Sequence, residues 1–421
     1  MLLGEATHGT QEFYLARAAI TKDLVAKHGF EAVAIEADWP NSYRANQYVM
    51  GCGSRDANAQ EALSGFCRFP RWMWMNTVVA EFIEWLREHN KPRQANRRVG
   101  FYGLDLYSLT ASRRAVIDYL DKVDSGAAER ARRRYECFDH VGKDPQRYGL
   151  EVATGVRGRG KSGVVAQLVE MLRNTQEQLE RYTTEGTEDH GSAAAFYAEQ
   201  NARVVKNAEE YYTSMFDVSR ESWNVRDTHM METLERLVGW IRVRDGGHGK
   251  VVVWAHNSHL GDCRATQMGR QGNQLNLGQL VREKWGKRCK NIGFTTYTGT
   301  VMAADDWGAP GKVKKVVPAR EDSFEWALNQ RGESFFLPLA REEACEEVEQ
   351  DLGGEKLERA IGVIYLPHIE RTSHYFYAEL TRQFDGVVHF RKTSALKPLE
   401  AGRIKSKKAV EGELLEEELI G

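Results

Sequence analysis

Five side chains that can exchange protons or bind a metal ion follow short apolar segments of this chain. They are Glu5, His8, Glu36, His256 and His259. Histidine titrates near pH 6.5 when unperturbed, and a carboxylate beside an imidazole favours its protonated form. A Glu–His pair therefore suits acid–base catalysis at neutral pH. We predict a general-base site, in which an imidazole takes a proton from water.

The apolar segments that precede these residues span residues 1–3, 32–35 and 251–255. Short continuous apolar runs bounded by turn residues are typical of buried strands in a parallel sheet. A fourth such run, 99–104, leads to Asp105. Ligands of open α/β sheets bind outside the carboxyl ends of the strands, so we expect these runs to deliver their polar residues to one place. The first run is shorter than a usual strand, so either the sequence begins inside a longer strand or this strand is short.

The patterns of the α/β part predict a mostly parallel sheet flanked by helices. Thr10 is a candidate cap for a first helix that ends at Gly29, because these residue types favour the two ends of helices. Residues 76–89 predict another helix from their apolar spacing. Further strands are expected at 291–296, 361–366 and 386–390. Alternating strands and helices favour the α/β class.

Charged helical segments dominate the stretch between residues 110 and 245. We expect helices at 112–123, 126–140, 162–182, 192–216 and 225–243. This predicts an all-helical lobe, residues 111–245, inserted in an α/β catalytic lobe of residues 1–110 and 246–400. The two lobes are expected to form a cleft at the strand carboxyl ends. The charged tail, 401–421, is expected to fray.

Composition excludes several classes of partner. The 421 residues carry a formal net charge of −2, with no indication of a nucleic-acid-binding surface. No apolar stretch approaches the roughly 20 residues that span a bilayer, and the amino terminus lacks the layout of a signal peptide. The six cysteines contain no CxxC pair and are expected to be free thiols. We predict a cytoplasmic protein that acts on a small molecule and binds neither nucleic acid nor membrane.

Each candidate residue also has a purely structural interpretation. His8 can bond to the backbone while Glu5 caps a helix, and a buried Glu36 can form a salt bridge to a helix. Arg17 falls on the apolar side of the first helix. A buried guanidinium needs an anionic partner, so Glu36 or a substrate anion is expected, with a surface ion pair as the alternative.

A metal site is an open alternative to metal-free catalysis, for which no cofactor is expected. A catalytic zinc ion takes three protein ligands and keeps an open position. The residues that could supply them are His8, Glu36, His256 and His259. HxxH spacing alone indicates a metal only weakly.

Nucleotide binding is a second alternative, through the segment Gly155–Ser162. This segment satisfies the P-loop pattern G-x-x-x-x-G-K-[ST]. The preceding residues 150–154 are a poor strand, however, and no apolar run ending in Asp follows to hold magnesium. The G-x-S-x-G elbow of serine hydrolases is also missing, so direct activation of water is the simpler inference.

Several segments together resemble the erythromycin esterase family. They are GEATHGT at 4–10, IEADW at 35–39, FYGLD at 101–105, QNAR at 200–203, NVRDT at 224–228, AHNSHL at 255–260, IGFT at 292–295 and ERTSHYF at 370–376. The resemblance runs from residue 1 to about residue 395. It departs from the family pattern in the residues missing before Leu2 and in the Gly/Arg-rich segment 155–163.

The resemblance implies a hydrolase that cleaves an ester or lactone, with an α/β lobe and a helical lobe around a cleft. By motif position, the family's catalytic residues fall on His8, Glu5, Glu36, Arg17 and His256. Substrate contacts are then expected at His259, Tyr102, Asp105, Arg226 and Trp39. The best-described family members work without a metal, which implies no cofactor here. The family is functionally broad and includes proteins associated with succinoglycan biosynthesis.

These inferences together predict a mechanism. His8 withdraws a proton from the water that attacks an ester carbonyl, while Glu5 and Glu36 hold the imidazole and the water. Arg17 and His256 are expected to stabilise the oxyanion or orient the ester. The prediction requires His8 to lie within reach of a hydrogen-bonded water from at least one of the two glutamates.

Overall fold

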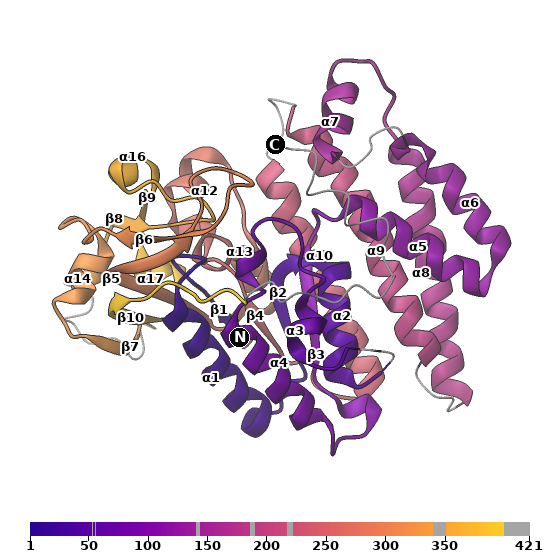
Figure 1. Cartoon of the computed structure of the whole chain (residues 1–421), viewed down its shortest axis with the longest axis horizontal. Helices are drawn as coiled ribbons and strands as arrows, with labels where there is room; N and C mark the ends of the chain where they lie inside the picture. Colours follow the sequence, from indigo (N-terminus) through magenta and orange to yellow (C-terminus); the bar gives the residue numbers. More distant parts are fainter. Residues whose placement is uncertain are drawn as a thin grey trace.

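A central sheet and a layer of helices beside it make up the protein (Figure 1). The computed structural model describes residues 1–52, 54, 56–139, 144–185, 190–216, 222–339 and 351–399. The predicted tail, 401–421, lies outside the described residues. The predicted α/β class is confirmed.

The main sheet has eight strands in the order β3-β2-β4-β1-β5-β10-β7, with β6 paired to β5 beside this path. Their bounds are β1 Leu2–Leu3, β2 Ala32–Asp38, β3 Gly100–Asp105, β4 Val251–Trp254, β5 Asn291–Ala303, β6 Lys312–Val316, β7 Ser334–Pro338 and β10 Gly386–Thr393. The pairs among β3, β2, β4, β1, β5 and β10 are parallel, whereas β6 and β7 pair antiparallel. A separate antiparallel pair joins β8, Lys356–Arg359, to β9, Tyr375–Ala378.

Helices cover both faces of the sheet centre, which is why β2 and β4 read as continuous apolar runs. Side chains alternate between the two faces of a strand. Ile35 packs with α1 (Gln11–His28) and α4 (Thr77–Asn90) on one face. Ala34 packs with α10 (Ser222–Asp245) on the other. Both faces are thus closed to solvent, and the polar strand ends are left to form the site.

The start and the end of helix α1 differ in how well the sequence predicted them. The helix ends as expected at Gly29, which adopts the left-handed conformation with φ of 66°. Thr10 occupies the N-cap position, but its side chain makes no capping hydrogen bond. Its hydroxyl pairs instead with the hydroxyl of Thr7. Thr10 therefore stabilises the loop after β1 and does not cap the helix.

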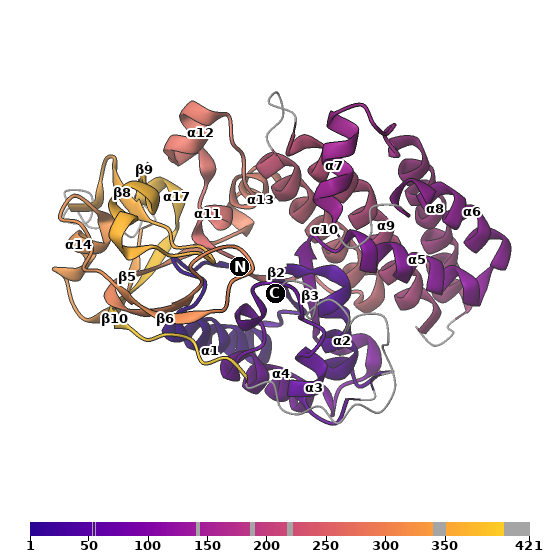
Figure 2. The same cartoon turned by 45° about the horizontal axis from the view of Figure 1, so that its top comes forward.

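The connection from β3 to β4 carries the helical layer. Its other helices are α5 Leu109–Val123, α6 Ser125–Tyr135, α7 Pro145–Ala153, α8 Lys161–Glu185 and α9 His190–Ser214. Figure 2 shows these helices grouped on one side of the sheet. They share an apolar core of their own, which includes Leu120, Ala131, Tyr148 and Val205. A helix lies at each of the five predicted places, but α7 was not predicted. The division into lobes at residues 110 and 245 stays a prediction.

The segment 361–366 is not the strand that its apolar residues predicted. Its backbone forms two isolated β-bridges, one from Ile361 to Thr7 and one from Ile364 to Ala304. The two partners lie in different loops, so no continuous strand forms. The strands β6, β7, β8 and β9 were not predicted. The sequence of β6 is Lys-Val-Lys-Lys-Val, and most of the strand is exposed. Its three lysines leave too few apolar residues to indicate a strand from the sequence.

The remaining described helices are short and mostly connect strands. They are α2 Trp39–Met50, α3 Ala59–Leu63, α11 Asn257–Leu260, α12 Gln267–Gly272, α13 Leu277–Trp285, α14 Phe324–Asn329, α16 Glu370–Ser373 and α17 Leu380–Gln383. Among the described residues, no helix is both long enough and apolar enough to cross a bilayer. The five described cysteines form no disulfide, and Cys345 lies outside the described residues.

Candidate active site

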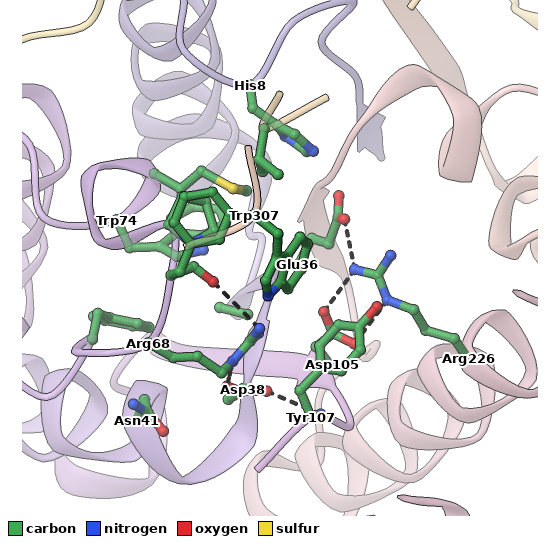
Figure 3. Close-up of a pocket in the computed structure, with 16 residues that line it drawn as sticks. His8, Glu36, Asp38, Asn41, Arg68, Trp74, Asp105, Tyr107, Arg226 and Trp307 are labelled. Atoms are coloured by element: carbon green, nitrogen blue, oxygen red, sulfur yellow. Dashed lines mark hydrogen bonds and ion pairs between the residues drawn. The ribbon is translucent and has the colours of Figure 1, made fainter. Parts of the chain in front are cut away.

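The carboxyl ends of neighbouring strands surround one cavity of 180 Å³ (Figure 3). Glu36 and Asp38 end β2, Asp105 ends β3, and His8 lies in the loop that follows β1. Arg226, near the start of α10, closes the cavity from the helical side. This is the convergence at strand ends that the sequence predicted.

The loop that carries His8 is held by backbone contacts on both sides. The N–H of His8 donates to the Ile361 carbonyl (3.3 Å), and the Gly9 carbonyl accepts from Met302 N–H (2.9 Å). Gly9 lies so close to this strand that a Cβ atom would come within 1.9 Å of the Met302 carbonyl oxygen. The close approach requires glycine and fixes the position of the neighbouring imidazole.

Glu5 and His8 form the predicted pair. His8 Nδ1 lies 3.0 Å from Glu5 Oε1, and the other carboxylate oxygen, Oε2, accepts from Arg17 Nη2 (2.8 Å). Glu5 is fully buried, and His8 is buried apart from a small exposed part. The carboxylate therefore joins the imidazole to a buried guanidinium.

Arg17 has a different partner from the one expected. Its ion pair is with Glu5, not with Glu36 or a substrate anion, because α1 packs its side chain beneath the loop after β1. The guanidinium lies over the rings of Tyr14 (4.3 Å) and Trp254 (5.3 Å). Arg17 does not line the cavity, so its geometry suits positioning of Glu5 and not contact with an oxyanion.

Glu36 lines the cavity and is held by three donors from other elements. Its Oε1 atom accepts from Arg226 Nη2 (2.7 Å) and lies 3.3 Å from His259 Nε2. Its Oε2 atom accepts from the backbone N–H of His256 (2.8 Å). Burial opposes ionisation, but His259 and then Arg226 outweigh it and hold the pKa of Glu36 well below its usual value. Glu36 is therefore a carboxylate at neutral pH.

His259 lies between two carboxylates. Its Nδ1 atom is 2.9 Å from Asp227 Oδ2, and its ring stacks on Trp223 with centroids 4.3 Å apart. Burial alone would lower its pKa, but Asp227 and then Glu36 raise the pKa of His259 to about 9. The ring is thus an imidazolium at neutral pH. It lies 3.0 Å from Nη1 of Arg226, and the carboxylates of Glu36, Asp105 and Asp227 offset the two positive charges.

Two arginines and two aspartates complete the polar wall. Arg226 Nη2 donates to Asp105 Oδ2 (2.7 Å), and Arg68 Nε donates to Asp38 Oδ2 (2.8 Å). Both guanidiniums lie over the Tyr107 ring, at 5.0 and 4.5 Å. Burial opposes ionisation of Asp105, but Arg226 outweighs it and lowers the pKa of Asp105. For Asp38, burial and the neighbouring Asp105 outweigh Arg68 and raise the pKa.

His256 lies behind His8 and does not line the cavity. The centroids of the two rings are 4.8 Å apart. Burial and then the neighbouring His8 lower the pKa of His256 to about 3, so the ring is neutral at neutral pH. Its Nδ1 atom accepts from the backbone N–H of Ser258 (3.2 Å). The proton of the neutral ring therefore lies on Nε2.

Comparison with known proteins assigns this chain to a family. The family model of the erythromycin esterases matches residues 25–393. The chain belongs to the erythromycin esterase family. An erythromycin esterase type II from Escherichia coli is 22% identical over 93% of this chain and 89% of the relative. An erythromycin esterase type I from Escherichia coli is 23% identical over 71% of this chain and 70% of the relative.

Solved structures share the fold of this erythromycin esterase family member. A succinoglycan biosynthesis protein superposes with a TM-score of 0.69 at 21% identity, covering 94% of this chain and 88% of the other. A Bacillus cereus protein gives 0.70 at 21% identity, covering 95% and 90%. A histidine-to-asparagine mutant of the erythromycin esterase EreC, in its open conformation, gives 0.58 at 18% identity, covering 95% and 91%.

Two residues expected to contact substrate lie away from the cavity in this family member. Trp39 and Tyr102 stack on each other with centroids 5.8 Å apart, and Trp39 also stacks on Tyr197 of α9 (6.4 Å). Both are buried between the sheet and the helical layer. Asp105 and Arg226 do line the cavity, whereas His259 reaches it only through Glu36 and Arg226.

Several residues of the site carried no clear sequence signal. Arg68 and Phe69 come from the connection after α3, Trp307 from the turn after β5, and Tyr107 from the residues after β3. Periodicity identifies helices and strands but not which loop reaches a cavity. Asp38 lies two residues after Glu36, and both line the cavity although the pairing of β2 with β3 is irregular between Ile35 and Asp38.

The two alternative chemistries gain no support in this family member. No group of three or more His, Cys, Asp and Glu side chains is arranged to hold a metal ion in the part of the chain that the structure describes. The segment 155–160 follows helix α7, whereas a P-loop follows a strand. Its Arg159 pairs with Glu209, and the backbone N–H of Gly160 donates to the Tyr148 hydroxyl.

Proposed function

We propose that this protein hydrolyses a carboxylic ester or lactone, with His8 as the general base that activates water. The observation that carries the proposal is the buried Glu5–His8 pair at the edge of the cavity. The curated relatives are named as erythromycin esterases, which supports a macrolide-type lactone as the substrate class.

The hydrogen bonds of His8 decide which of its nitrogen atoms is the base. An ionised carboxylate can only accept hydrogen bonds, so the Glu5 contact places the ring proton on Nδ1. The lone pair of the neutral ring is then on Nε2. Among the described residues, none forms a hydrogen bond to Nε2. A water molecule in the cavity is the partner left for it, and Glu5 stabilises the imidazolium that proton transfer creates.

Arg226 is the group we assign to the negative charge that develops on the ester oxygen. Its Nε and Nη2 atoms are engaged by Asp105 and Glu36. Among the described residues, Nη1 contacts His259 Nε2, towards which one of its two N–H groups points, so the other N–H group is left for a substrate oxygen. Donors fixed in a water-poor site before reaction act strongly on such charge. The carboxylate of Glu36 fixes Arg226 and helps hold the attacking water.

His8→Ala tests the assignment of the base. General-base catalysis contributes about 10² to 10⁴ in rate, so kcat should fall by that factor on a panel of esters and lactones that includes erythromycin. Glu5→Gln should also lower kcat, because the ring loses the carboxylate that orients it. His28→Ala is the matched control, because His28 is exposed at the end of the same helix that holds Arg17.

The assignment fails if His8→Ala protein folds normally and retains wild-type hydrolysis of every ester that the wild type cleaves. Loss of activity in chelator with recovery in zinc would favour the metal alternative instead. ATP binding that disappears in Lys161→Ala would favour the nucleotide alternative.

A further inference from the structure

Trp307 is a large aromatic side chain exposed at the cavity. It lines the cavity together with His8 and Glu36, yet 59% of the residue is accessible to solvent. The other tryptophan of the cavity wall, Trp74, is buried. A single exposed aromatic side chain is common on protein surfaces, but this one lies on the wall of the cavity, where a bound substrate would meet it.

A rigid turn presents Trp307. The N–H of Ala309 donates to the Asp306 carbonyl (3.2 Å), and Gly308 between them has φ of 80°. These features match a type II turn with Trp307 at its second position. The Asp306 carboxylate also accepts from the Trp307 N–H (2.7 Å). Trp307 is therefore fixed in place by the backbone of the turn.

Ion pairs and one ring contact brace this turn from outside. Lys312 and Lys314 of β6 both pair with Asp305 at the base of the turn (2.6 and 2.5 Å). The indole meets the edge of Phe69, from the connection after α3, with centroids 5.1 Å apart and planes at 61°. Trp307 and Phe69 thus come from distant parts of the chain and meet at the wall of the cavity.

The cavity is too small to hold a bulky ester completely. Apolar cavities of about 150 Å³ hold one benzene ring, and pockets that enclose drug-sized ligands reach about 300–1,000 Å³. The present cavity of 180 Å³ has room for the ester group and roughly one ring beside it. The remainder of a larger substrate must lie at the entrance, where the aromatic pair is.

We propose that Trp307, braced by Phe69, is a specificity platform for the part of a bulky ester that stays outside the cavity. The portion it favours is apolar and presents a flat or ring-shaped face to the indole. The proposal deepens the proposed function, since it names the substrate class as esters with a bulky apolar ring next to the ester group. Small esters fill the cavity without reaching the platform.

Binding of two unreactive amides tests the platform without requiring ester hydrolysis. N-(4-nitrophenyl)cyclohexanecarboxamide carries the ring, and N-(4-nitrophenyl)acetamide carries a methyl group in its place. Calorimetry gives the Kd of each for the wild type, Trp307→Ala, Trp307→Phe and Phe336→Ala. Phe336 is the control because it is 57% exposed, on β7, and does not line the cavity.

The wild type should prefer the cyclohexane compound, and Trp307→Ala should reduce that preference about tenfold. Tenfold corresponds to roughly 55 Å² of apolar area at about 25 cal/mol per Å². Trp307→Phe should retain part of the preference, and Phe336→Ala all of it. The proposal is overturned if the wild type shows no preference, or if Trp307→Ala preserves it. Neither result bears on His8, whose role is judged from hydrolysis by His8→Ala.

Discussion

Buried charges in this site come as alternating acids and bases, and this alternation decides what each can do. Arg17 and His8 share Glu5, while Arg226 and His259 share Glu36. A buried charge without a partner would cost several kcal/mol, so Glu36 and His259 stay ionised because each faces groups of opposite charge. His8 is the member whose second nitrogen faces no partner among the described residues, which is why we propose it as the base.

His259 gives the site a pH dependence whose sign follows from its raised pKa. Its folded pKa of about 9 lies above the ordinary 6.5, so its contribution to stability is complete below about pH 6.5 and is lost as pH rises through 9. A shift of this size corresponds to about 3 kcal/mol. The difference in unfolding free energy between wild type and His259→Gln should therefore shrink by about that amount from pH 6.5 to pH 9.5.

Urea unfolding at several pH values measures this difference. Other groups that titrate in the same range cancel in the comparison, such as the Met1 amino group, whose pKa burial lowers to about 6. A difference that stays constant across the range would contradict the imidazolium assignment.

At the residue scale, the sequence predicted some residues that the structure brings together at the cavity, but not which side chain pairs with which. Glu5 with His8 was predictable because three residues separate them in one loop. The partner of Arg17 was not, because it depends on how α1 packs under the loop. The bond from Arg226 to Glu36 joins residues 190 positions apart, which periodicity and spacing cannot foresee.

At the scale of elements, the loop between β1 and α1 is the part that most constrains the site. Strand β1 has only two residues, yet its loop crosses β5 and the segment after β8 in close contact. The backbone of Gly9 makes that crossing possible. Positioning of His8 therefore depends on a glycine with no chemistry of its own.

Gly9→Ala should destabilise the protein and lower activity together. The new methyl group would overlap the Met302 carbonyl, so the loop or β5 must shift, at a cost of about 1–3 kcal/mol or more. Gly158→Ala is the matched control, because nothing lies within 4 Å of its Cβ position, and its stability should change by less than about 1 kcal/mol. Unfolding curves and kcat of both variants decide the matter; equal behaviour of the two variants would contradict the argument.

Buried elements were predictable from the sequence and exposed ones were not. Apolar runs identified β2, β3 and β4, which helices cover on both faces. Edge strands such as β6 and β7 carry charged or exposed residues, so their pattern does not stand out from a loop. The segment 361–366 misled because its apolar residues are buried against β5 and β6, while its backbone makes two isolated bridges and forms no strand.

At the scale of the whole molecule, an aromatic stack joins the sheet to the helical layer. Trp39 lies between Tyr102 of β3 and Tyr197 of α9, and its indole N–H donates to the Tyr197 carbonyl (3.3 Å). The stack is buried and separate from the cavity. We therefore expect Trp39 to stabilise the contact between the two layers.

Trp39→Ala should lower the unfolding free energy by about 3–5 kcal/mol, as expected for removal of a buried tryptophan. Trp307→Ala, which removes an exposed tryptophan, should cost far less. Denaturant unfolding of the two variants side by side measures this contrast. If Trp39→Ala proves as stable as Trp307→Ala, the stack does not hold the layers together.

The overall class and the helical region were predictable because both depend on long periodic patterns. The way the layers meet was not, since it rests on single contacts between distant segments. Trp39 illustrates the difference. The resemblance to the family suggested contact with substrate, but Trp39 lies at the start of α2, stacks on Tyr197 of α9 and does not line the cavity.

Helix α10 packs on the sheet and also supplies two residues of the site. These are Arg226, which binds Glu36, and Asp227, which binds His259. This has a practical consequence for chimeras between relatives. Transplanting the helices of residues 109–214 would exchange no residue that lines the cavity and would leave the ion pairs of the recipient's site intact. A graft that extended through residues 222–245 would import a foreign guanidinium opposite the host's Glu36, and the junction should therefore be cut before α10 begins.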